Sequence, residues 1–273
     1  MQFVEAHGAR IPIVGFGSMR LKEEAGAAAI ESAIRAGYRH IDTAAFYGNE
    51  REVGQAIKAS GVRREDLFVV TKVRDNNLKA DDFARSLDNS LKLLDLPAVD
   101  LLLIHWPNPQ VPMTESIGAL NKAKRDGLTR HIGVCNHTVA LLAEAHAVTQ
   151  EPLVTNQIEV HPFLDQTRVI EASRGYGMAI TAYCPIARGR VPGNATLERI
   201  GAAHGKSASQ VSLRWLVQQG IIVIPGSGKP ERQKENFEVL DFSLSPAEMN
   251  EIAGLKRPDG RVVNPPQAPK WDV

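Results

Sequence analysis

A short apolar run followed by a helix-like pattern occurs eight times along this chain. The apolar runs lie at 14–17, 38–42, 67–72, 99–105, 130–136, 153–159, 178–184 and 221–225. The helix-like patterns follow at about 23–36, 49–60, 79–94, 115–126, 138–147, 166–174, 194–219 and 230–239, the seventh with a break near Gly205. Such nearly continuous apolar runs are typical of parallel strands that are covered on both faces. The eight units predict an α/β fold, a single (β/α)₈ barrel domain over residues 1–273.

An open, doubly wound sheet is the alternative architecture, but such sheets usually have fewer strand–helix units. Residues 2–13 predict a β-hairpin with its turn around His7 and Gly8. Residues 245–255 predict one more helix, with Ser245 as its N-cap and Pro246 in its first turn. The tail from residue 256 to 273 is rich in proline and carries Trp271. We expect this tail to lie over the active-site face of the barrel.

Composition limits the partners of the chain. A formal net charge of +1 and 23% charged residues give no basic surface for nucleic acid or an acidic membrane. No apolar run approaches the ~20 residues that span a bilayer, and no secretory signal pattern precedes the first strand. The two cysteines fit free thiols in a reducing compartment, and the histidines and cysteines show no close metal-ligand spacing. We therefore expect a cytoplasmic, monomeric protein without a metal site.

Chemically active side chains stand at the ends of three consecutive predicted strands. Asp42 ends the second strand, Lys72 the third and His105 the fourth, and Tyr47 lies in the loop after Asp42. In a (β/α)₈ barrel the catalytic groups lie at the C-terminal ends of the strands. Because neighbouring strands are ~4.8 Å apart, we expect these four side chains to meet in one site.

The four residue types together predict proton donation by the tyrosine. A tyrosine ionises near pH ~10, and lowering its pKa by ~3 units requires ~4 kcal/mol. A lysine ammonium ~4 Å away supplies about that much at an effective dielectric constant of ~20, with Asp42 as the counter-ion of Lys72. Desolvation of the tyrosinate works against this effect, so the lysine must be held charged and close. His105 can donate a hydrogen bond to a substrate carbonyl. The predicted chemistry is protonation of a carbonyl oxygen while electrons arrive at its carbon.

Several motifs of the chain are similar to those of the aldo-keto reductases, over essentially its whole length. They are His40-Ile41-Asp42-Thr43-Ala44, Tyr47-Gly48-Asn49-Glu50, Thr71-Lys72, Leu103-Ile104-His105-Trp106-Pro107, Gly133-Val134-Cys135-Asn136, Asn156-Gln157-Ile158-Glu159 and Ala182-Tyr183-Cys184-Pro185. The chain resembles most the bacterial 2,5-diketo-D-gluconate reductase-like members. The resemblance implies reduction of a small aldehyde or ketone with NADPH, or alternatively NADH, as cofactor.

The resemblance also implies a role for each matching residue. Tyr47 would be the general acid, Lys72 and Asp42 would set its pKa, and His105 would orient the substrate. Tyr183 would stack on the nicotinamide, and Asn136 and Gln157 would hold its carboxamide. The remaining cofactor contacts would come from Cys135, Pro185, Ile186, Arg188, Gly189, Ser227, Lys229, Arg232, Glu235 and Asn236. The substrate pocket would include Met19, Phe46, Trp106 and Trp271.

Three positions depart from the usual family pattern. Gly226 stands where a lysine usually precedes the serine of the last cofactor loop, and Lys229 is the next cation along the chain. Cys135 replaces a common serine with a weaker hydrogen-bond donor. Met19 replaces a residue that is often aromatic, which favours a more adaptable pocket. The choice between NADPH and NADH and the identity of the substrate stay open.

Two other functions remain compatible with the sequence. One is a nucleotide-sensing binding protein with the same fold and little or no turnover. The other is a barrel hydrolase that uses Asp42 with another strand-end carboxylate such as Glu159.

Overall fold

Eight parallel strands form the centre of the computed structural model, which describes residues 1–272. Neighbouring strands follow one another in chain order across the sheet. They are β3 (Phe16–Gly17), β4 (His40–Asp42), β5 (Phe68–Val73), β6 (Val99–Ile104), β7 (Thr129–Cys135), β8 (Leu153–Glu159), β9 (Ala179–Tyr183) and β10 (Ile222–Val223). The predicted strand–helix alternation is confirmed, and with it the α/β barrel fold.

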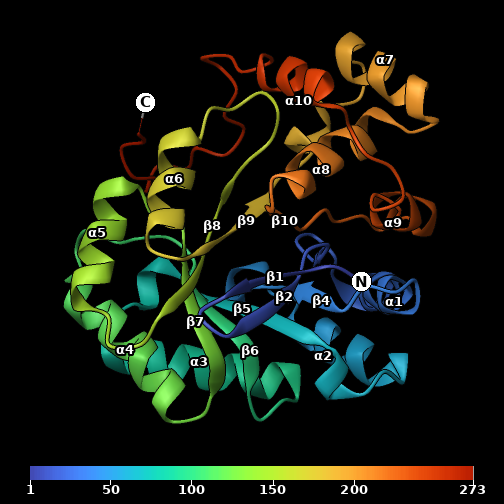
Figure 1. The fold of residues 1–273 in the computed structure, drawn as a ribbon. Coiled ribbons are helices and arrows are strands. Elements are labelled where there is room, and N and C mark those ends of the chain that lie inside the picture. Colours follow the sequence, from blue (N-terminus) through green and yellow to red (C-terminus); the bar gives the residue numbers. More distant parts are fainter. Residues whose placement is uncertain (273) are drawn as a thin grey trace.

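The helices lie around the outside of the strands (Figure 1). They are α1 (Glu23–Arg35), α2 (Glu50–Ser60), α3 (Ala80–Leu94), α4 (Met113–Arg125), α5 (Val139–Val148), α6 (Thr167–Gly175), α7 (Ala195–His204), α8 (Ala208–Gln218), α9 (Pro230–Phe237) and α10 (Pro246–Ala253). The predicted break near Gly205 separates α7 from α8. Gly205 ends α7 in the left-handed conformation, and Ser207 starts α8 with a capping box to Gln210.

The first and last strands of the barrel are shorter than the sequence predicts. Runs of four and five residues were expected at 14–17 and 221–225, but β3 and β10 each contain two residues. The two strands meet through a parallel bridge between Val14 and Val223. The amides of Gly15 and Gly17 donate to the carbonyls of Val223 and Pro225 at 2.8 and 3.1 Å. These bonds close the sheet, which rules out the open-sheet alternative.

The predicted N-terminal hairpin is confirmed, and it covers the bottom of the barrel. Strands β1 (Phe3–Ala6) and β2 (Ala9–Pro12) pair antiparallel through a turn in which His7 and Gly8 both have positive φ. Three buried hairpin residues pack on the barrel interior in a cluster with Phe68, Val70, Leu101, Leu103, Cys135, Val154, Ala179 and Ile222; they are Ala6, Ala9 and Ile11. Figure 1 shows the hairpin lying across the strands. The opposite, C-terminal end of the barrel is left for a site.

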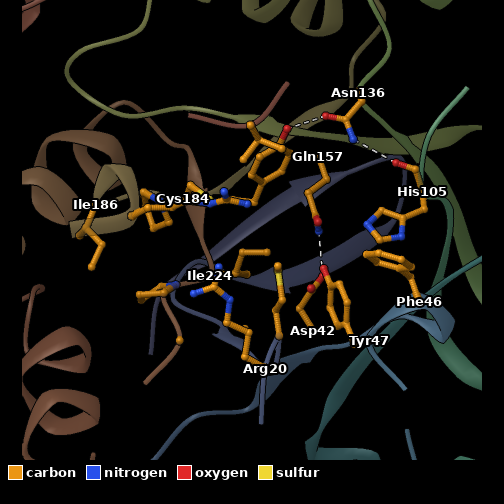
Figure 2. Close-up of a pocket in the computed structure, with 18 of the residues that line it drawn as sticks. Arg20, Asp42, Phe46, Tyr47, His105, Asn136, Gln157, Cys184, Ile186 and Ile224 are labelled. Carbon is orange, nitrogen blue, oxygen red and sulfur yellow. Dashed lines mark hydrogen bonds between the residues drawn. The ribbon is translucent and has the colours of Figure 1, made fainter. Parts of the chain in front are cut away.

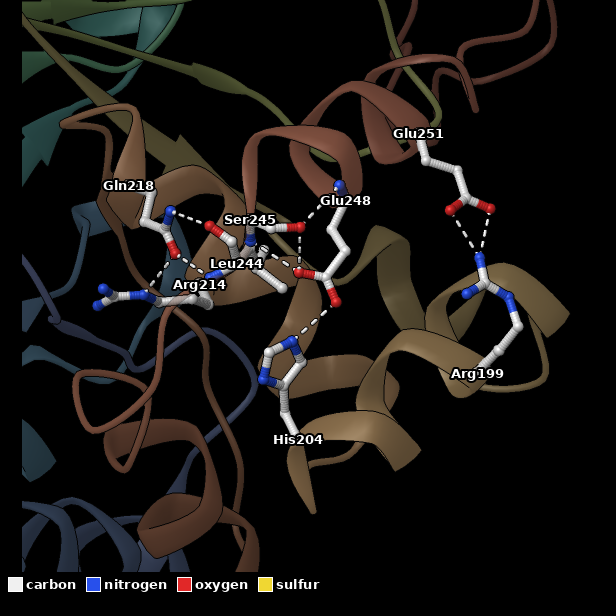
Figure 3. A network of polar contacts seen from close by, with 8 residues as sticks. All are labelled: Arg199, His204, Arg214, Gln218, Leu244, Ser245, Glu248 and Glu251. Carbon is white, nitrogen blue, oxygen red and sulfur yellow. Dashed lines mark hydrogen bonds and ion pairs between the residues drawn. The ribbon is translucent and has the colours of Figure 1, made fainter.

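Helix α10 is attached to α7 by polar contacts (Figure 3). Ser245 and Glu248 form a capping box at the start of α10. The Glu248 carboxylate also lies 2.8 Å from Nε2 of His204, and Arg199 donates to Glu251 at 2.5 Å. These contacts fix the point from which the C-terminal tail departs.

The tail crosses the C-terminal face of the barrel, which confirms the prediction for residues 256–272. Val263, Pro265 and Gln267 line the cavity at that face. Farther on, Trp271 packs edge-to-face on Trp106, and the Asp272 carboxylate accepts the amide of Val139 at 2.9 Å, at the N-terminus of α5. Residue 273, which belongs to the predicted tail, lies outside the described residues. Across residues 1–272, no helix is long and apolar enough to cross a membrane.

Candidate active site

A cavity of about 610 Å³ opens at the C-terminal ends of the strands. Tyr47, His105 and Phe46 lie together on one side of it, and Cys184 and Ile186 lie on the other (Figure 2). Many residues named from the sequence line it: Met19, Asp42, Phe46, Tyr47, His105, Trp106, Asn136, Gln157, Tyr183, Pro185, Ile186, Arg188, Gly189 and Arg232. The structure therefore brings the predicted catalytic residues and most predicted cofactor contacts to one place.

Lys72 lies directly behind Tyr47. Its side chain is fully buried, and its Nζ donates to Asp42 Oδ1 at 2.5 Å, to the Thr43 carbonyl at 2.8 Å and to the Tyr47 hydroxyl at 3.4 Å. Among the described residues, Lys72 is not one of those that line the cavity. Tyr47 ends a short 3₁₀ helix, η1 (Ala45–Tyr47), which Gly48 terminates in the left-handed conformation. The lysine therefore acts on the cavity from behind Tyr47 and Asp42, which both line it.

The ionisation of this group is set by burial and charge pairing. Burial alone lowers the pKa of Lys72, but the adjacent Asp42 carboxylate raises it, and the net pKa lies above its ordinary value. Burial raises the pKa of Tyr47 to about 12, although the Lys72 ammonium acts in the opposite direction. The expectation that Lys72 brings the pKa of Tyr47 below its ordinary value is wrong, because desolvation of the tyrosinate outweighs the nearby charge. At neutral pH the site holds a protonated tyrosine beside a charged lysine.

His105 follows β6 and is neutral. Burial, and then the charges of Lys72 and Arg74, hold the pKa of His105 well below its ordinary value. Its ring packs edge-on to Tyr47, with 5.6 Å between the ring centroids. Its buried Nδ1 has no hydrogen-bond partner among the residues described. A neutral imidazole offers one N–H donor, which suits a hydrogen bond to a carbonyl oxygen.

Two amide side chains hold the site together, a role that the sequence did not indicate. Gln157 donates through Nε2 to Asp42 Oδ2 at 2.8 Å, so both oxygens of Asp42 are engaged. Asn136 donates to the His105 carbonyl at 3.0 Å and accepts the Tyr183 hydroxyl at 2.7 Å (Figure 2). Asn136 adopts a left-handed conformation (φ 59°), an uncommon backbone geometry that is often found at functional sites.

The loop after β9 forms a cationic wall of the cavity. Cys184, Ala187 and Arg188 have φ values of 49°, 49° and 50°, a cluster of unusual backbone conformations. The Ser212 hydroxyl of α8 fixes the loop by donating to the Pro185 carbonyl at 2.7 Å. Two other arginines, Arg20 after β3 and Arg232 on α9, line the same cavity. Guanidinium groups so arranged suit the phosphates of a dinucleotide.

Some residues named from the sequence do not line this cavity among the described residues: Cys135, Ser227, Lys229, Glu235, Asn236 and Trp271. Cys135 lies in the barrel interior against the hairpin, and burial raises the pKa of its thiol. The Glu235 carboxylate accepts the Ser207 hydroxyl. Trp271 lies behind the lining, where its ring contacts Trp106 and its Nε1 donates to Asn264 at 2.9 Å.

The cavity is also lined by Gly226, which the sequence placed in the last cofactor loop, and by residues to which the sequence assigned no role: Gly17, Arg20, Cys184, Ile224, Pro225, Val263, Pro265 and Gln267. The three tail residues belong to no motif, and their position depends on the path of the tail.

The surroundings of the Glu159 carboxylate do not suit a catalytic carboxylate of a hydrolase. Its carboxylate is fully buried, and the amides of Val262 and Val263 donate to its two oxygens at 2.6 and 2.8 Å. It is not among the described residues that line the cavity. The geometry therefore gives no support to a two-carboxylate hydrolase.

Comparison with known proteins agrees with this fold. The profile of the Aldo/keto reductase family matches residues 13–257. Methylglyoxal reductase DkgB of Salmonella typhimurium (strain LT2) is 41% identical over 266 residues, which are 96% of this chain and 99% of that protein.

Two solved structures show the same similarity. The crystal structure of a putative 2,5-diketo-D-gluconic acid reductase B superimposes with a TM-score of 0.96 at 46% identity, covering 100% of this chain and 98% of the other. The Bombyx mori aldo-keto reductase in complex with NADP superimposes with a TM-score of 0.86 at 34% identity, covering 94% and 92%. The chain therefore belongs to the aldo-keto reductase family and is an oxidoreductase that acts on carbonyl groups.

Proposed function

We propose that this protein reduces small aldehydes or ketones to alcohols with NADPH, and that Tyr47 donates the proton. The observation that supports this assignment most strongly is the buried pair of Lys72 and Asp42, whose ammonium lies 3.4 Å from the Tyr47 hydroxyl. Tyr47 and His105 both line the cavity, so one carbonyl oxygen can meet both groups.

The residues divide the proton chemistry among them. The bound cofactor supplies the hydride. Tyr47 is protonated before the reaction and gives its proton to the carbonyl oxygen as negative charge develops there. Lys72 stabilises the tyrosinate that this transfer leaves, and Asp42 keeps Lys72 charged and in place. His105 donates a hydrogen bond that directs the carbonyl oxygen toward Tyr47.

The lining of the cavity fits a nicotinamide dinucleotide. Tyr183, Asn136 and Gln157 lie at the ends of β7, β8 and β9, beside Tyr47. The arginines Arg20 and Arg188 are available to the phosphates. In this proposal, Tyr183 would hold the nicotinamide ring, and Oε1 of Gln157 would be free to accept from its carboxamide, since Nε2 is bound to Asp42.

Position 226 is a glycine and supplies no cation. The preference for NADPH in this proposal therefore depends on positively charged residues elsewhere. A Cβ atom added to Gly226 would lie 2.2 Å from the carbonyl oxygen of Gly17. A lysine there would force apart the backbones that close the barrel. We assign the recognition of the extra phosphate to Arg232 and Lys229, two cations at the start of α9.

The proposed substrates are small and polar dicarbonyls. Met19, Phe46 and Trp106 form an apolar rim, and Gln267 contributes an amide from the tail. The similar proteins are named for methylglyoxal and for 2,5-diketo-D-gluconic acid, both of which carry two carbonyl groups. These names and this lining support the same substrate class here.

A panel of carbonyl substrates tests the proposal. Methylglyoxal, a keto-sugar acid, a simple aldehyde and a bulky ketone are each incubated with NADPH and with NADH, and cofactor oxidation is followed. We expect the highest kcat/KM for a dicarbonyl with NADPH. Binding of NADPH without reduction of any carbonyl would instead support a nucleotide-sensing protein. A preference for NADH would contradict the assigned role of Arg232 and Lys229.

A further inference from the structure

The C-terminal tail is attached to the barrel by a buried carboxylate at the end of β8. Glu159 Oε1 accepts the amide of Val262 at 2.6 Å, and Oε2 accepts the amide of Val263 at 2.8 Å. Nε2 of His161 lies 2.9 Å from Oε1, and both side chains are fully buried. One carboxylate thus binds two consecutive backbone amides of a segment more than a hundred residues away along the chain.

The geometry is that of a strong attachment. Burying a carboxylate is costly unless it is hydrogen-bonded. Amide bonds to an ionised oxygen are about twice as strong as those between neutral groups. The tail also approaches the barrel closely just before these bonds, because a Cβ atom on Gly260 would lie 1.8 Å from the Phe163 carbonyl oxygen. These contacts therefore fix the distance between the tail backbone and the C-terminal ends of the strands.

The attached residues lead directly into the wall of the cavity. Val263 itself lines the cavity, and Pro265 and Gln267 follow within four residues. Glu159 pairs in the sheet with Tyr183, which also lines the cavity. Other polar anchors of the tail lie farther along the chain from these lining residues. They join Lys256 to Asp165, the Arg257 amide to the Phe163 carbonyl, Arg190 to the Asp259 carbonyl, and Asp272 to the start of α5.

We propose that Glu159 is a positioning residue that clamps the tail through the amides of Val262 and Val263 and thereby sets the affinity for the carbonyl substrate. This inference rests on the proposed carbonyl reduction. Glu159 touches neither the Tyr47 group nor the cavity, so it acts through Val263, Pro265 and Gln267. Glu159 thereby fixes the position of the cavity lining that these three tail residues form. It leaves the proton donor and the cofactor contacts unchanged.

The substitution Glu159→Gln tests the clamp while preserving the size of the side chain. The amide turns an NH₂ group toward one of the two tail amides, so one acceptor is lost. We expect KM for the preferred substrate to rise about tenfold, because one of the two hydrogen bonds that hold the tail in place is lost. We expect kcat to change less than about threefold, the Kd for NADPH to stay the same, and hydrogen exchange to accelerate in residues 261–267.

Two further variants separate the clamp from general damage. Val262→Pro removes one of the two donors from the side of the tail, at a residue that is not among the described residues lining the cavity, and the barrel residues are untouched. It should raise KM as Glu159→Gln does, and the double variant should show less than the sum of the two effects. Lys256→Ala removes an exposed anchor of the same tail and should leave KM and hydrogen exchange in residues 261–267 unchanged.

Specific outcomes would overturn the inference. An unchanged KM in both clamp variants, or an equal loss of substrate and NADPH affinity, would contradict it. If Glu159→Gln does not fold, the KM, the Kd for NADPH and the hydrogen exchange of Val262→Pro decide alone. If the wild-type protein reduces no carbonyl, the proposed function fails, but hydrogen exchange in the tail still tests the clamp. Exchange that is no faster in the variants than in the wild type would then refute it.

Discussion

Replacing Lys72 by methionine removes the charge behind Tyr47 while keeping most of the side-chain volume. The ammonium lies 3.4 Å from the Tyr47 hydroxyl and is fully buried. At an effective dielectric constant of about 20, a unit charge at that distance stabilises the tyrosinate by about 5 kcal/mol. Losing part of this stabilisation in the transition state should lower kcat by about 10³-fold.

The same substitution leaves Asp42 buried without its counter-ion. Removing one partner of a buried ion pair costs about 3–5 kcal/mol of folding stability. The double variant Lys72→Met, Asp42→Asn avoids this cost and serves as the matched control, because Gln157 can still contact the amide. We expect the double variant to regain stability in urea denaturation but to remain about as slow as Lys72→Met alone.

Single-turnover oxidation of NADPH at saturating substrate is the assay. NADPH affinity, measured by fluorescence, should be unchanged, since Lys72 does not line the cavity among the described residues. Wild-type activity should be flat between about pH 6 and about pH 9. Over that range Tyr47, whose pKa is raised to about 12, stays protonated, and His105, whose pKa is lowered, stays neutral. A kcat within about tenfold of wild type in Lys72→Met would refute the electrostatic role of the lysine.

Three further substitutions test the packing of the fold. Gly226→Ala places a Cβ atom 2.2 Å from the Gly17 carbonyl oxygen and should cost about 2 kcal/mol of stability and weaken NADPH binding, whereas Gly228→Ala, with its nearest contact at 3.5 Å, should change neither. Burial lowers the pKa of His137 to about 4, so the unfolded chain takes up this proton first. The wild type should then lose about 3 kcal/mol more than His137→Phe between about pH 6.5 and about pH 4 in urea denaturation. Glu248→Ala removes the capping box of α10 and should cost about 1 kcal/mol, seen as a lower Tm.

The catalytic group was predictable because it depends on chain order. Asp42, Lys72 and His105 end three consecutive strands, and consecutive parallel strands are neighbours in this barrel. Once the eightfold pattern was identified, the meeting of their side chains followed from the spacing of the strands. The hairpin over the bottom of the barrel and the break between α7 and α8 were likewise encoded locally, in His7-Gly8 and Gly205.

Features that depend on long-range packing were not predictable. The pKa of Tyr47 is raised, opposite to the expectation, because desolvation outweighs the charge of Lys72. The extent of desolvation depends on tertiary packing, which no sequence motif specifies. The attachment of Val262 and Val263 to Glu159 joins segments that no local pattern connects. Gly226 was read as a missing lysine, but its cause is the close approach of the backbone to Gly17 where the barrel closes.

The direct test of the central claim is the single-turnover rate of Tyr47→Phe with NADPH and the preferred carbonyl substrate. The substitution removes the hydroxyl that lies 3.4 Å from Lys72 and leaves the ring contact with His105. If Tyr47 donates the proton, the rate should fall by about 10²- to 10⁴-fold, with NADPH affinity unchanged. A single-turnover rate equal to that of the wild type would contradict the assignment of Tyr47 as the acid.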